Sequence, residues 1–457
     1  MRALSSVRSS EEALPSSPLM SVFAELHIGI DDVDSPRGGC TTHFTYVFLR
    51  RLLSKVPEAR LIDYPNLVRL NPSIPFKTRG NGGVSVRVTL PRELVKEVVN
   101  ILHESLDDYI SELGGGGDAG ALVVEAPAHK RLRRLYWKAL TDYVHRDYLM
   151  TLLENVGDLT HYVRGGRGLV GAAAAIGWYI PSDCTYELIL YRDGERCVDR
   201  DAFMRTAKGL ANVLFSNWVG ERLLIMPHGP DPVLAGVRGE DPSTLLTFTD
   251  PGIYCGKVGG WMIYRTNQGT NQHHIIRTDA LRPYQTGCFD GVVVSRPETR
   301  KGGDVVIRVA WGGVTTYAAF FRETGLSRVA RSLLIGDAVR VCGTAKYWEG
   351  IGAVIHAETL TVWPRPVVTV RNPRCPRCGA RMKSAGRGKG WKCPKCGYRS
   401  TNLRREITLG KREPLLMGLH VPRDDAIKHL IKPRQRYGKE KVCVPSPPIT
   451  RWSDFTP

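Results

Sequence analysis

The stretch HIGIDDVDSPRGGCTTHF, residues 27–44, places three carboxylates close together in the sequence. They would repel one another unless a cation lay between them, and carboxylates are ligands that Mg²⁺ takes together with phosphate oxygens and water. The stretch therefore predicts a site for a metal-bound phosphate that is formed by Asp31, Asp32 and Asp34. An Asp-rich turn that only caps the following helix is an alternative that the pattern leaves open.

The residues after the aspartates also suit an anion. Gly38 and Gly39 would let the backbone approach a phosphate closely, and a helix that begins near Thr41 would offer its free N–H groups. Thr41 would present its hydroxyl at the same place. We therefore expect Gly39 and Thr41 to lie beside the phosphate.

A Gly-rich loop, KTRGNGG at residues 77–83, supplies charge of the opposite sign. Lys77 and Arg79 could neutralise phosphate oxygens, and Asn81 tolerates a left-handed backbone. The chain has no GxxxxGK[ST] motif, so the loop is not a Walker A sequence. Taken alone such a loop is often a hairpin turn, but a nucleotide site needs both signs of charge and the aspartates provide the other.

Two CxxC pairs near the C-terminus have the spacing of a zinc site. Fourteen residues separate the pairs, and glycines beside the cysteines allow tight turns. Four thiolates close the coordination shell, so the zinc would be structural. The predicted ligands are Cys375, Cys378, Cys393 and Cys396.

The segment around these cysteines is strongly basic. The chain carries a net charge of +19, and residues 371–412 contain fourteen Lys or Arg and a single acidic residue, Glu406. Basic residues mixed with aromatic ones suit phosphate neutralisation and base stacking, although zinc ribbons also bind proteins. The candidate RNA-binding residues are Arg377, Lys389, Trp391, Lys392, Lys395 and Arg399.

Several elements must position these residues. Alternating residues predict strands at 25–32 and 84–88, and apolar residues at helical spacing predict helices from Thr41 and over 91–113, the second ended by GGGG. Residues 120–275 mix helical and strand patterns. From residue 284 short strands and turns predict a small closed barrel of the OB type, with another small β-domain as the alternative. The fold class is therefore multidomain α+β.

Composition narrows the class of protein. With 457 residues, 42% hydrophobic and 24% charged, the chain has the make-up of an ordinary globular protein of several domains. Its longest uncharged apolar run, 168–180, is shorter than the roughly 20 residues of a membrane span. Residues 1–24 resemble a Ser-rich leader and not a signal peptide, which predicts a cytoplasmic protein with no membrane partner.

Three further features have plainer explanations. Seven cysteines lie outside the CxxC pairs, and the odd total of eleven without a secretion signal predicts reduced thiols. RGGRGLVGAAAAIGW at 164–178 could be another phosphate loop that opens a helix or a run of small residues that pack tightly. Packing is the preferred interpretation, with the roles of Arg164 and Arg167 undecided. His273 and His274 are expected to be polar surface residues, because adjacent histidines point different ways.

The motifs GIDDVDS…GGCTT, RLNPSIPFKTRGNGGV and YRTNQGTNQ, followed by the CxxC pairs, resemble the archaeal agmatidine synthetases that modify isoleucine tRNA (2-agmatinylcytidine synthetase, TiaS). The resemblance covers about residues 25–405. It implies an enzyme, a ligase that forms a C–N bond and conjugates agmatine to C2 of the wobble cytidine in a CAU anticodon. ATP would be consumed to AMP and two phosphates, and the tRNA carrying agmatidine would then decode AUA.

The resemblance also implies an order of domains. After a disordered leader over 1–24, an atypical kinase-like, ATP-binding α/β domain is expected over 25–165 and a ferredoxin-like α+β domain over 166–275. An OB fold over 284–365, a zinc ribbon over 370–402 and a basic C-terminal tail over 403–457 would complete the chain.

Carried over position by position, the resemblance gives roles to the first motifs. Asp31, Asp32 and Asp34 would bind Mg²⁺ and ATP, and Thr41 would be the threonine that the family phosphorylates on itself. Gly39, Lys77, Arg79 and Asn81 would complete the ATP site. The chain departs from the family in having Val33 where threonine is expected.

The resemblance leaves the agmatine contacts open. Agmatine carries two positive charges, so an acidic pocket is expected, and Asp183, Glu187 or Asp250 could contribute to it. Two other functions remain open on the residues alone. One is a non-catalytic OB-fold and zinc-ribbon protein that binds RNA or a single strand, and the other is conjugation of a different amine, such as lysine.

Overall fold

The computed structural model describes residues 22–77, 80–113, 118–363, 366–411 and 417–456. The leader expected over 1–24 therefore lies almost wholly outside the described residues, and so does Arg79 of the basic loop. Among the helices that are described, none has the length and apolar character needed to cross a membrane.

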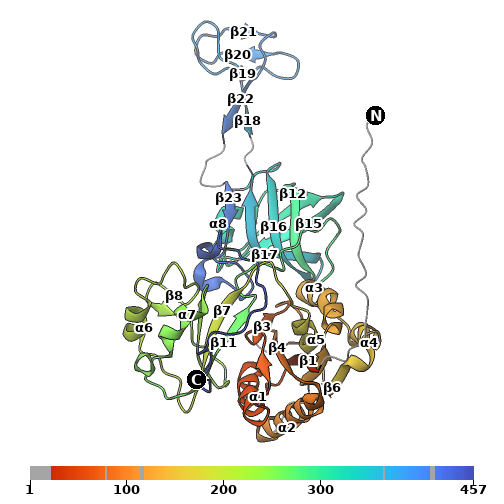
Figure 1. Ribbon diagram of the computed structural model, residues 1–457. Coiled ribbons are helices and arrows are strands. Elements are labelled where there is room, and N and C mark those ends of the chain that lie inside the picture. Colours follow the sequence, from red (N-terminus) through yellow and green to blue (C-terminus); the bar gives the residue numbers. More distant parts are fainter. Residues whose placement is uncertain (1–21, 78–79, 114–117, 364–365, 412–416, 457) are drawn as a thin grey trace, which may run out of the picture.

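One nine-stranded sheet runs through the first part of the chain (Figure 1). Its strand order is β10–β7–β11–β3–β4–β1–β5–β6, with β2 also paired to β4, and among the described strands of this sheet only the β11–β3 pair is parallel. The strands are β1 (Phe23–Asp31), β2 (Arg60–Leu61), β3 (Asn66–Arg69), β4 (Gly82–Pro91), β5 (Gly120–Glu125), β6 (Thr160–Gly165), β7 (Thr185–Arg192), β10 (Val233–Gly239) and β11 (Val258–Thr266). The sheet therefore extends across both the expected kinase-like and the expected ferredoxin-like segments.

Helices cover both faces of this sheet. The longer helices α1 (Thr41–Lys55) and α2 (Val95–Leu113) join a core with α6 (Arg200–Ala207) and α7 (Pro242–Leu245). A second core on the other face holds α3 (Arg133–Thr141), α4 (Arg146–Glu154) and α5 (Leu169–Ile176). The apolar residues that the sequence places at helical spacing in α1 contribute to the first core. Phe44, Phe48 and Leu52 are all fully buried there.

The barrel predicted from residue 284 is confirmed as a closed barrel of five strands. Strands β12, β16, β17, β15 and β14 follow one another, and β12 pairs with β14 to close the ring. The bounds are β12 (Thr286–Val293), β13 (Glu298–Thr299), β14 (Val305–Trp311), β15 (Val314–Phe320), β16 (Ala338–Trp348) and β17 (Gly352–Val362), with α8 (Leu326–Ala330) before β16 and β23 (Gly418–His420) paired to β17.

A two-stranded stalk carries the cysteine-rich segment away from the barrel (Figure 1). Strands β18 (Pro366–Arg371) and β22 (Glu406–Lys411) form the stalk by antiparallel pairing. At its end lies a small sheet of β19 (Lys383–Ser384), β20 (Trp391–Lys392) and β21 (Arg399–Ser400). The remaining pair, β8 (Trp218–Val219) and β9 (Arg222–Leu223), forms a short hairpin before β10.

The expectation that the scattered cysteines are reduced thiols is wrong for six of the seven. They form three disulfides, Cys184–Cys443, Cys197–Cys255 and Cys288–Cys342, and only Cys40 of the seven is free. An odd total of eleven cysteines is compatible with three disulfides, because four cysteines belong to the CxxC pairs and Cys40 is free. The partners lie 54 to 259 residues apart in the sequence, so their pairing depends on the fold.

The expectation that His273 and His274 lie on the surface is also wrong. His273 is fully buried, and the Nε2 atoms of the two rings lie 2.8 Å and 3.1 Å from the carboxylate of Glu358 in β17. Burial opposes the charged form of Glu358, but the two histidines hold the pKa of its carboxyl well below the usual range. This cluster joins the segment after β11 to the barrel, which is why both rings turn inward.

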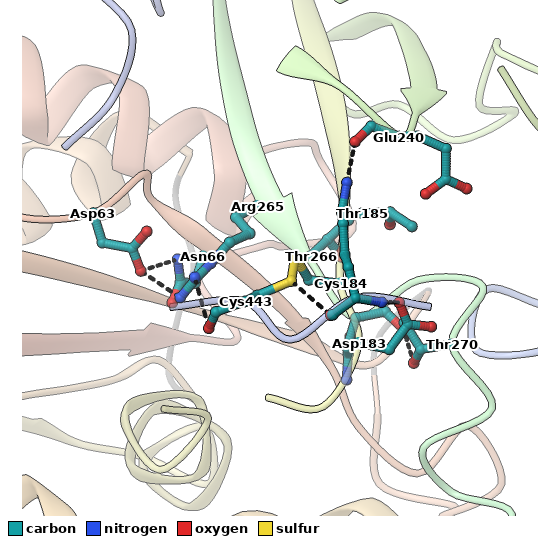
Figure 2. The surroundings of a disulfide bond; sticks show 12 residues. Asp63, Asn66, Asp183, Cys184, Thr185, Glu240, Arg265, Thr266, Thr270 and Cys443 are labelled. Carbon is teal, nitrogen blue, oxygen red and sulfur yellow. Dashed lines mark hydrogen bonds and ion pairs between the residues drawn. A yellow bond between two sulfur atoms is a disulfide. The ribbon is translucent and has the colours of Figure 1, made fainter. Parts of the chain in front are cut away.

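The described chain after residue 417 lies against the first part of the protein and is fixed there in two ways. Figure 2 shows the disulfide between Cys184 and Cys443, with Asp63 and Arg265 on one side and Asp183 and Glu240 on the other. Arg436 is fully buried, donates to both oxygens of Asp183 at 3.0 Å, and donates to Glu240 at 2.6 Å. A buried guanidinium between two carboxylates is stabilising only while all the partners are present.

Replacing Arg436 by methionine is therefore expected to lower the free energy of unfolding by about 3–5 kcal/mol, because buried Asp183 and partly buried Glu240 lose the guanidinium between them and Asp183 keeps only Lys432, at 3.5 Å. The measurement is urea unfolding monitored by circular dichroism. The matched control is Arg434→Met, an exposed arginine of the same turn, which should change stability little. Equal unfolding curves for the two variants would contradict this role of Arg436.

Candidate functional site

The three aspartates of the first motif lie where β1 ends. Asp31 is the last residue of the strand, and its Oδ1 accepts a hydrogen bond from the backbone N–H of Asp32 at 2.8 Å. Asp32 has a left-handed backbone with φ 58°, which turns the chain out of the sheet. Val33, the departure from the family motif, is fully buried in the core and does not line the cavity described below.

The start of α5 lies directly on these aspartates. A Cβ at Gly171 would overlap Oδ2 of Asp31, and a Cβ at Gly168 would come within 2.5 Å of the Asp31 carbonyl oxygen. Glycine at these positions is therefore required for the contact. The tight packing expected for 164–178 is found here. Arg164 and Arg167 form ion pairs with Asp107 and Asp118, and Arg167, Gly168 and Gly171 also line the cavity described below.

Burial and mutual repulsion set the electrostatics of this cluster. Burial, together with the charges of Asp32 and Asp34, raises the pKa of Asp31 to about 8. The carboxyl therefore holds a proton at neutral pH when no cation is nearby. A bound cation would favour the charged form, as the side-by-side carboxylates in the sequence suggested.

Thr41 and Gly39 lie in different surroundings. Thr41 is the first residue of α1, it is buried, and its Oγ1 accepts a long hydrogen bond of 3.4 Å from the N–H of Val33. It lines the same cavity as the three aspartates. Gly39 does not line that cavity, and a Cβ there would overlap the Leu113 side chain. The expected contact of Gly39 with a nucleotide is therefore not favoured by its position.

A cavity of about 500 Å³ brings these residues together with basic ones. Lys77 and Asn81 of the Gly-rich loop line it, as expected, and Asn81 has the left-handed backbone, φ 46°, that its type permits. A second cavity of about 540 Å³ shares part of its wall. The residues common to both cavities include Arg69, Lys77, Arg238 and His429.

Sequence reasoning missed two arginines of this wall. Glu187 holds Arg69 and Arg238 through contacts of 3.9 Å and 3.3 Å, and all three residues line the first cavity. Arg69 opens the quoted motif RLNPSIPF, which was a signal, but Arg238 lies in β10 and carries no motif. His429 was also missed, although its Nδ1 lies 2.8 Å from Gln268 Oε1 beside this cluster.

The three acidic candidates for agmatine lie apart. Of the three, only Glu187 lines the cavity, and two arginines already oppose its charge. Asp183 is bound to Arg436 of the C-terminal segment. Asp250 accepts from the N–H of Gly252 at 2.9 Å and caps a short 3₁₀ helix, η5 (Pro251–Ile253), elsewhere on the surface. The structure therefore does not bring the three together.

The CxxC pairs form a compact cluster at the end of the stalk. The four sulfur atoms lie within 4.8 Å of one another, with Cys375 Sγ 3.5 Å from Cys396 Sγ and Cys378 Sγ 3.4 Å from Cys393 Sγ. Thiolates at about 2.3 Å from a tetrahedral zinc would be separated by about 3.8 Å. The cluster therefore has the donor set and the size of a closed, structural zinc site.

The basic side chains around this cluster point largely to solvent. Five of the six candidate RNA-binding residues are exposed: Arg377, Lys389, Lys392, Lys395 and Arg399. Trp391 differs, because it is half-buried against the ribbon core and its Nε1 donates to the Leu403 carbonyl at 2.7 Å. Arg377 lies 5.1 Å from the centre of the Tyr398 ring, so basic and aromatic groups do share this surface.

Comparison with known proteins gives matches along the chain. Family models for the TiaS TCKD domain match residues 27–93, for the TiaS FLD domain residues 166–273, and for the TiaS C-terminal zinc ribbon domain residues 372–411. The isoleucine-tRNA 2-agmatinylcytidine synthetase TiaS of Ignisphaera aggregans is 39% identical over 92% of this chain and 94% of its own. The protein of that name from Staphylothermus marinus is also 39% identical, over 92% and 95%.

Solved structures agree. The crystal structure of TiaS in complex with isoleucine tRNA and ATP has a TM-score of 0.76 and 30% identity, covering 92% of this chain and 100% of that one. A complex of TiaS with the same tRNA, AMPCPP and agmatine has a TM-score of 0.73 and 28% identity with the same coverage. With relatives of this identity and coverage, and with the motifs read from its sequence, the chain belongs to the TiaS family of 2-agmatinylcytidine synthetases that act on isoleucine tRNA.

Proposed function

We propose that this protein uses ATP to join agmatine to C2 of the wobble cytidine in isoleucine tRNA with the anticodon CAU. The product would be agmatidine, and the tRNA would then decode AUA. The relatives named above carry the corresponding synthetase name, and a related structure holds isoleucine tRNA, an ATP analogue and agmatine together. These likenesses make the protein an ATP-dependent ligase.

The observation that supports this reaction best is the meeting of opposite charges in one cavity. Asp31, Asp32 and Asp34 lie on one wall, and Arg69, Lys77 and Arg238 line another part. We propose that the three aspartates hold Mg²⁺, which prefers oxygen ligands, and that the cations and Asn81 hold the phosphates of ATP. A volume of about 500 Å³ is within the usual range for a small-molecule site.

The reaction itself explains why such a site is needed. The oxygen on cytosine C2 is a poor leaving group until a phosphoryl group is attached to it. An amine of agmatine can then attack C2, so that the C–N bond forms, the C–O bond breaks and phosphate leaves with the oxygen. The cytosine must leave its stack to reach the cavity, at a cost of a few kcal/mol.

Agmatine would be drawn to the acidic part of the cavity. Besides the three aspartates, Asp142 and Asp231 line it. We infer that Glu187 acts differently, because its charge is opposed by Arg69 and Arg238. Its role would be to keep those two arginines oriented toward the phosphates.

A non-catalytic OB-fold and zinc-ribbon binding protein is the disfavoured alternative. Such a protein would use the barrel and the ribbon alone, and it would have no use for the aspartates at the end of β1. The packing of α5 onto Asp31 argues for a built site there. A direct competition between the two amines would test whether lysine is conjugated in place of agmatine.

We propose the cytoplasm as the compartment, because ATP and tRNA are found there.

With ATP and Mg²⁺ present, the protein should incorporate labelled agmatine into an isoleucine tRNA transcript bearing CAU. A methionine tRNA in the same assay should remain unlabelled. Asp32→Asn is expected to reduce labelling by about 100- to 1,000-fold, because it removes charge where the cation would bind. The matched control, Asp201→Asn on the exposed side of α6, should label normally. Absence of label in an intact protein that binds the tRNA would favour the non-catalytic alternative.

Thr41→Ala is expected to abolish both self-phosphorylation from γ-labelled ATP and agmatine conjugation, while tRNA binding is kept. The reason is that Thr41 lines the cavity of the three aspartates, whereas the ribbon that would bind the RNA is distant in the fold. Thr41→Ser keeps a hydroxyl and should retain both activities in part. Loss of tRNA binding in Thr41→Ala would instead indicate a role in folding.

The double variant Lys389→Gln/Lys392→Gln is expected to weaken tRNA binding and to reduce the slope of log K against log salt by about 1.5. Both lysines are exposed on the ribbon, where each could neutralise a phosphate. Filter binding at several salt concentrations gives the slope. The control is the double variant Lys96→Gln/Lys130→Gln, which changes two exposed lysines near the sheet. An equal decrease of the salt slope in this control would argue against a specific role of the ribbon.

A further inference from the structure

His429 lies in the wall that the two cavities share. It comes from the segment after the stalk, and its side chain is exposed because it lines both cavities. The backbone N–H of Gly269 donates to the His429 carbonyl at 2.7 Å, which fixes the segment at this point. A histidine can donate or accept a hydrogen bond on either ring nitrogen, so its role here depends on its neighbours.

The neighbours of His429 determine which of its nitrogens carries the proton. Gln268, from the motif YRTNQGTNQ, donates through its amide nitrogen to the carboxylate of Glu187. The amide oxygen of Gln268 therefore turns toward His429 and lies 2.8 Å from Nδ1. Because a carbonyl oxygen can only accept, Nδ1 of the neutral ring carries the proton and Nε2 carries the lone pair.

The charges around the ring keep it neutral. The charge of Arg69, together with the enclosed position of the ring and the charges of Arg238 and Lys77, holds the pKa of His429 well below its usual range. Nε2 is therefore a hydrogen-bond acceptor at neutral pH.

The space beside Nε2 is open to a ligand. This nitrogen lies next to Gly80 of the Gly-rich loop, where a Cβ would come within 3.3 Å of it. Among the residues that the structure describes, none forms a hydrogen bond with Nε2. An acceptor in a ligand cavity selects a group that carries N–H or O–H, and it repels the oxygens of an ionised phosphate. The group that His429 receives is therefore not a phosphate of ATP.

The amine of agmatine fits this position. Within the described chain, every charged residue that lines both cavities is a cation, namely Arg69, Lys77 and Arg238. Neighbouring cations lower the pKa of an amine, and the uncharged amine is the form that can attack C2 of the cytosine. The guanidinium of agmatine keeps its charge, so we expect it on the acidic side of the cavity, where Asp142 and Asp231 lie.

We propose that His429 positions agmatine for the attack on the cytosine, an inference that rests on the proposed function. Its Nε2 accepts an N–H hydrogen bond from the uncharged amine, so that the lone pair of the amine is free to face C2. Gln268 and Glu187 hold the ring in the orientation that this requires. Holding two reactants in the attacking geometry is a large part of the rate of a two-substrate reaction.

Two substitutions at His429 separate the functions of its two nitrogens. The amide of His429→Asn can take the place of Nδ1 and keep the hydrogen bond to Gln268, but it does not reach the position of Nε2. The longer amide of His429→Gln can place its oxygen near that position. We expect kcat/KM for agmatine to fall about 10- to 100-fold in His429→Asn and much less in His429→Gln. A ring that only holds the fold through Gln268 would give the opposite order.

The assay is incorporation of labelled agmatine into isoleucine tRNA bearing CAU, at several agmatine concentrations. Self-phosphorylation from γ-labelled ATP and binding of the tRNA should be unchanged in both variants, because neither involves the amine. The control is His103→Asn, at an exposed histidine of α2 paired with Asp107, which should match the unaltered protein. His429→Ala serves if His429→Asn does not fold, and added imidazole should then restore part of its conjugation.

The possible outcomes separate this inference from the proposed function. Equal kcat/KM for agmatine in His429→Asn and the unaltered protein would overturn the inference alone. A raised KM for the tRNA, with kcat/KM for agmatine unchanged, would overturn it as well, because Nε2 would then bind the amino group of the cytosine. Absence of conjugation by the unaltered protein would refute the proposed function, and this inference with it.

Discussion

The close contact between α5 and β1 is the constraint on which the site depends. Gly29, Gly168 and Gly171 leave no room for a Cβ, since each Cβ would overlap backbone or carboxylate atoms of the other element. The contact presses the start of a helix against Asp31 and Asp32. Burial in this contact, with the charges of Asp32 and Asp34, raises the pKa of Asp31 to about 8, so the carboxyl would lose its proton at neutral pH when a cation binds beside it.

The rest of the cavity is assembled from distant parts of the chain. Lys77 comes from the loop before β4, Arg69 from β3 and Arg238 from β10, while His429 comes from the segment after the stalk. The nine-stranded sheet makes this possible, because it joins the expected kinase-like and ferredoxin-like segments through the parallel β11–β3 pair. The buried Arg436 and the Cys184–Cys443 disulfide hold the last segment in place, and with it His429.

The sequence allowed prediction of those parts of the site that are local. The three aspartates and Thr41 lie within eleven residues, and the CxxC pairs have a fixed spacing, so short-range pattern was sufficient to place them together. The OB-type barrel followed from strand and turn patterns for the same reason. Features that depend on pairing between remote segments were missed or wrong: the disulfides, the burial of His273 and His274 against Glu358, and the arginines held by Glu187. Gly39 does not line the cavity, because the turn that contains it faces α2, which lies more than fifty residues later in the chain.

The most direct test of this account is a crystal structure with an ATP analogue and Mn²⁺ in place of Mg²⁺, read from the anomalous signal of manganese. The account predicts a manganese peak bound by carboxylate oxygens of Asp31, Asp32 or Asp34 and by phosphate oxygens, beside the start of α5. A peak held by the nucleotide on the far side of the cavity, with no manganese on any of the three aspartates, would contradict it.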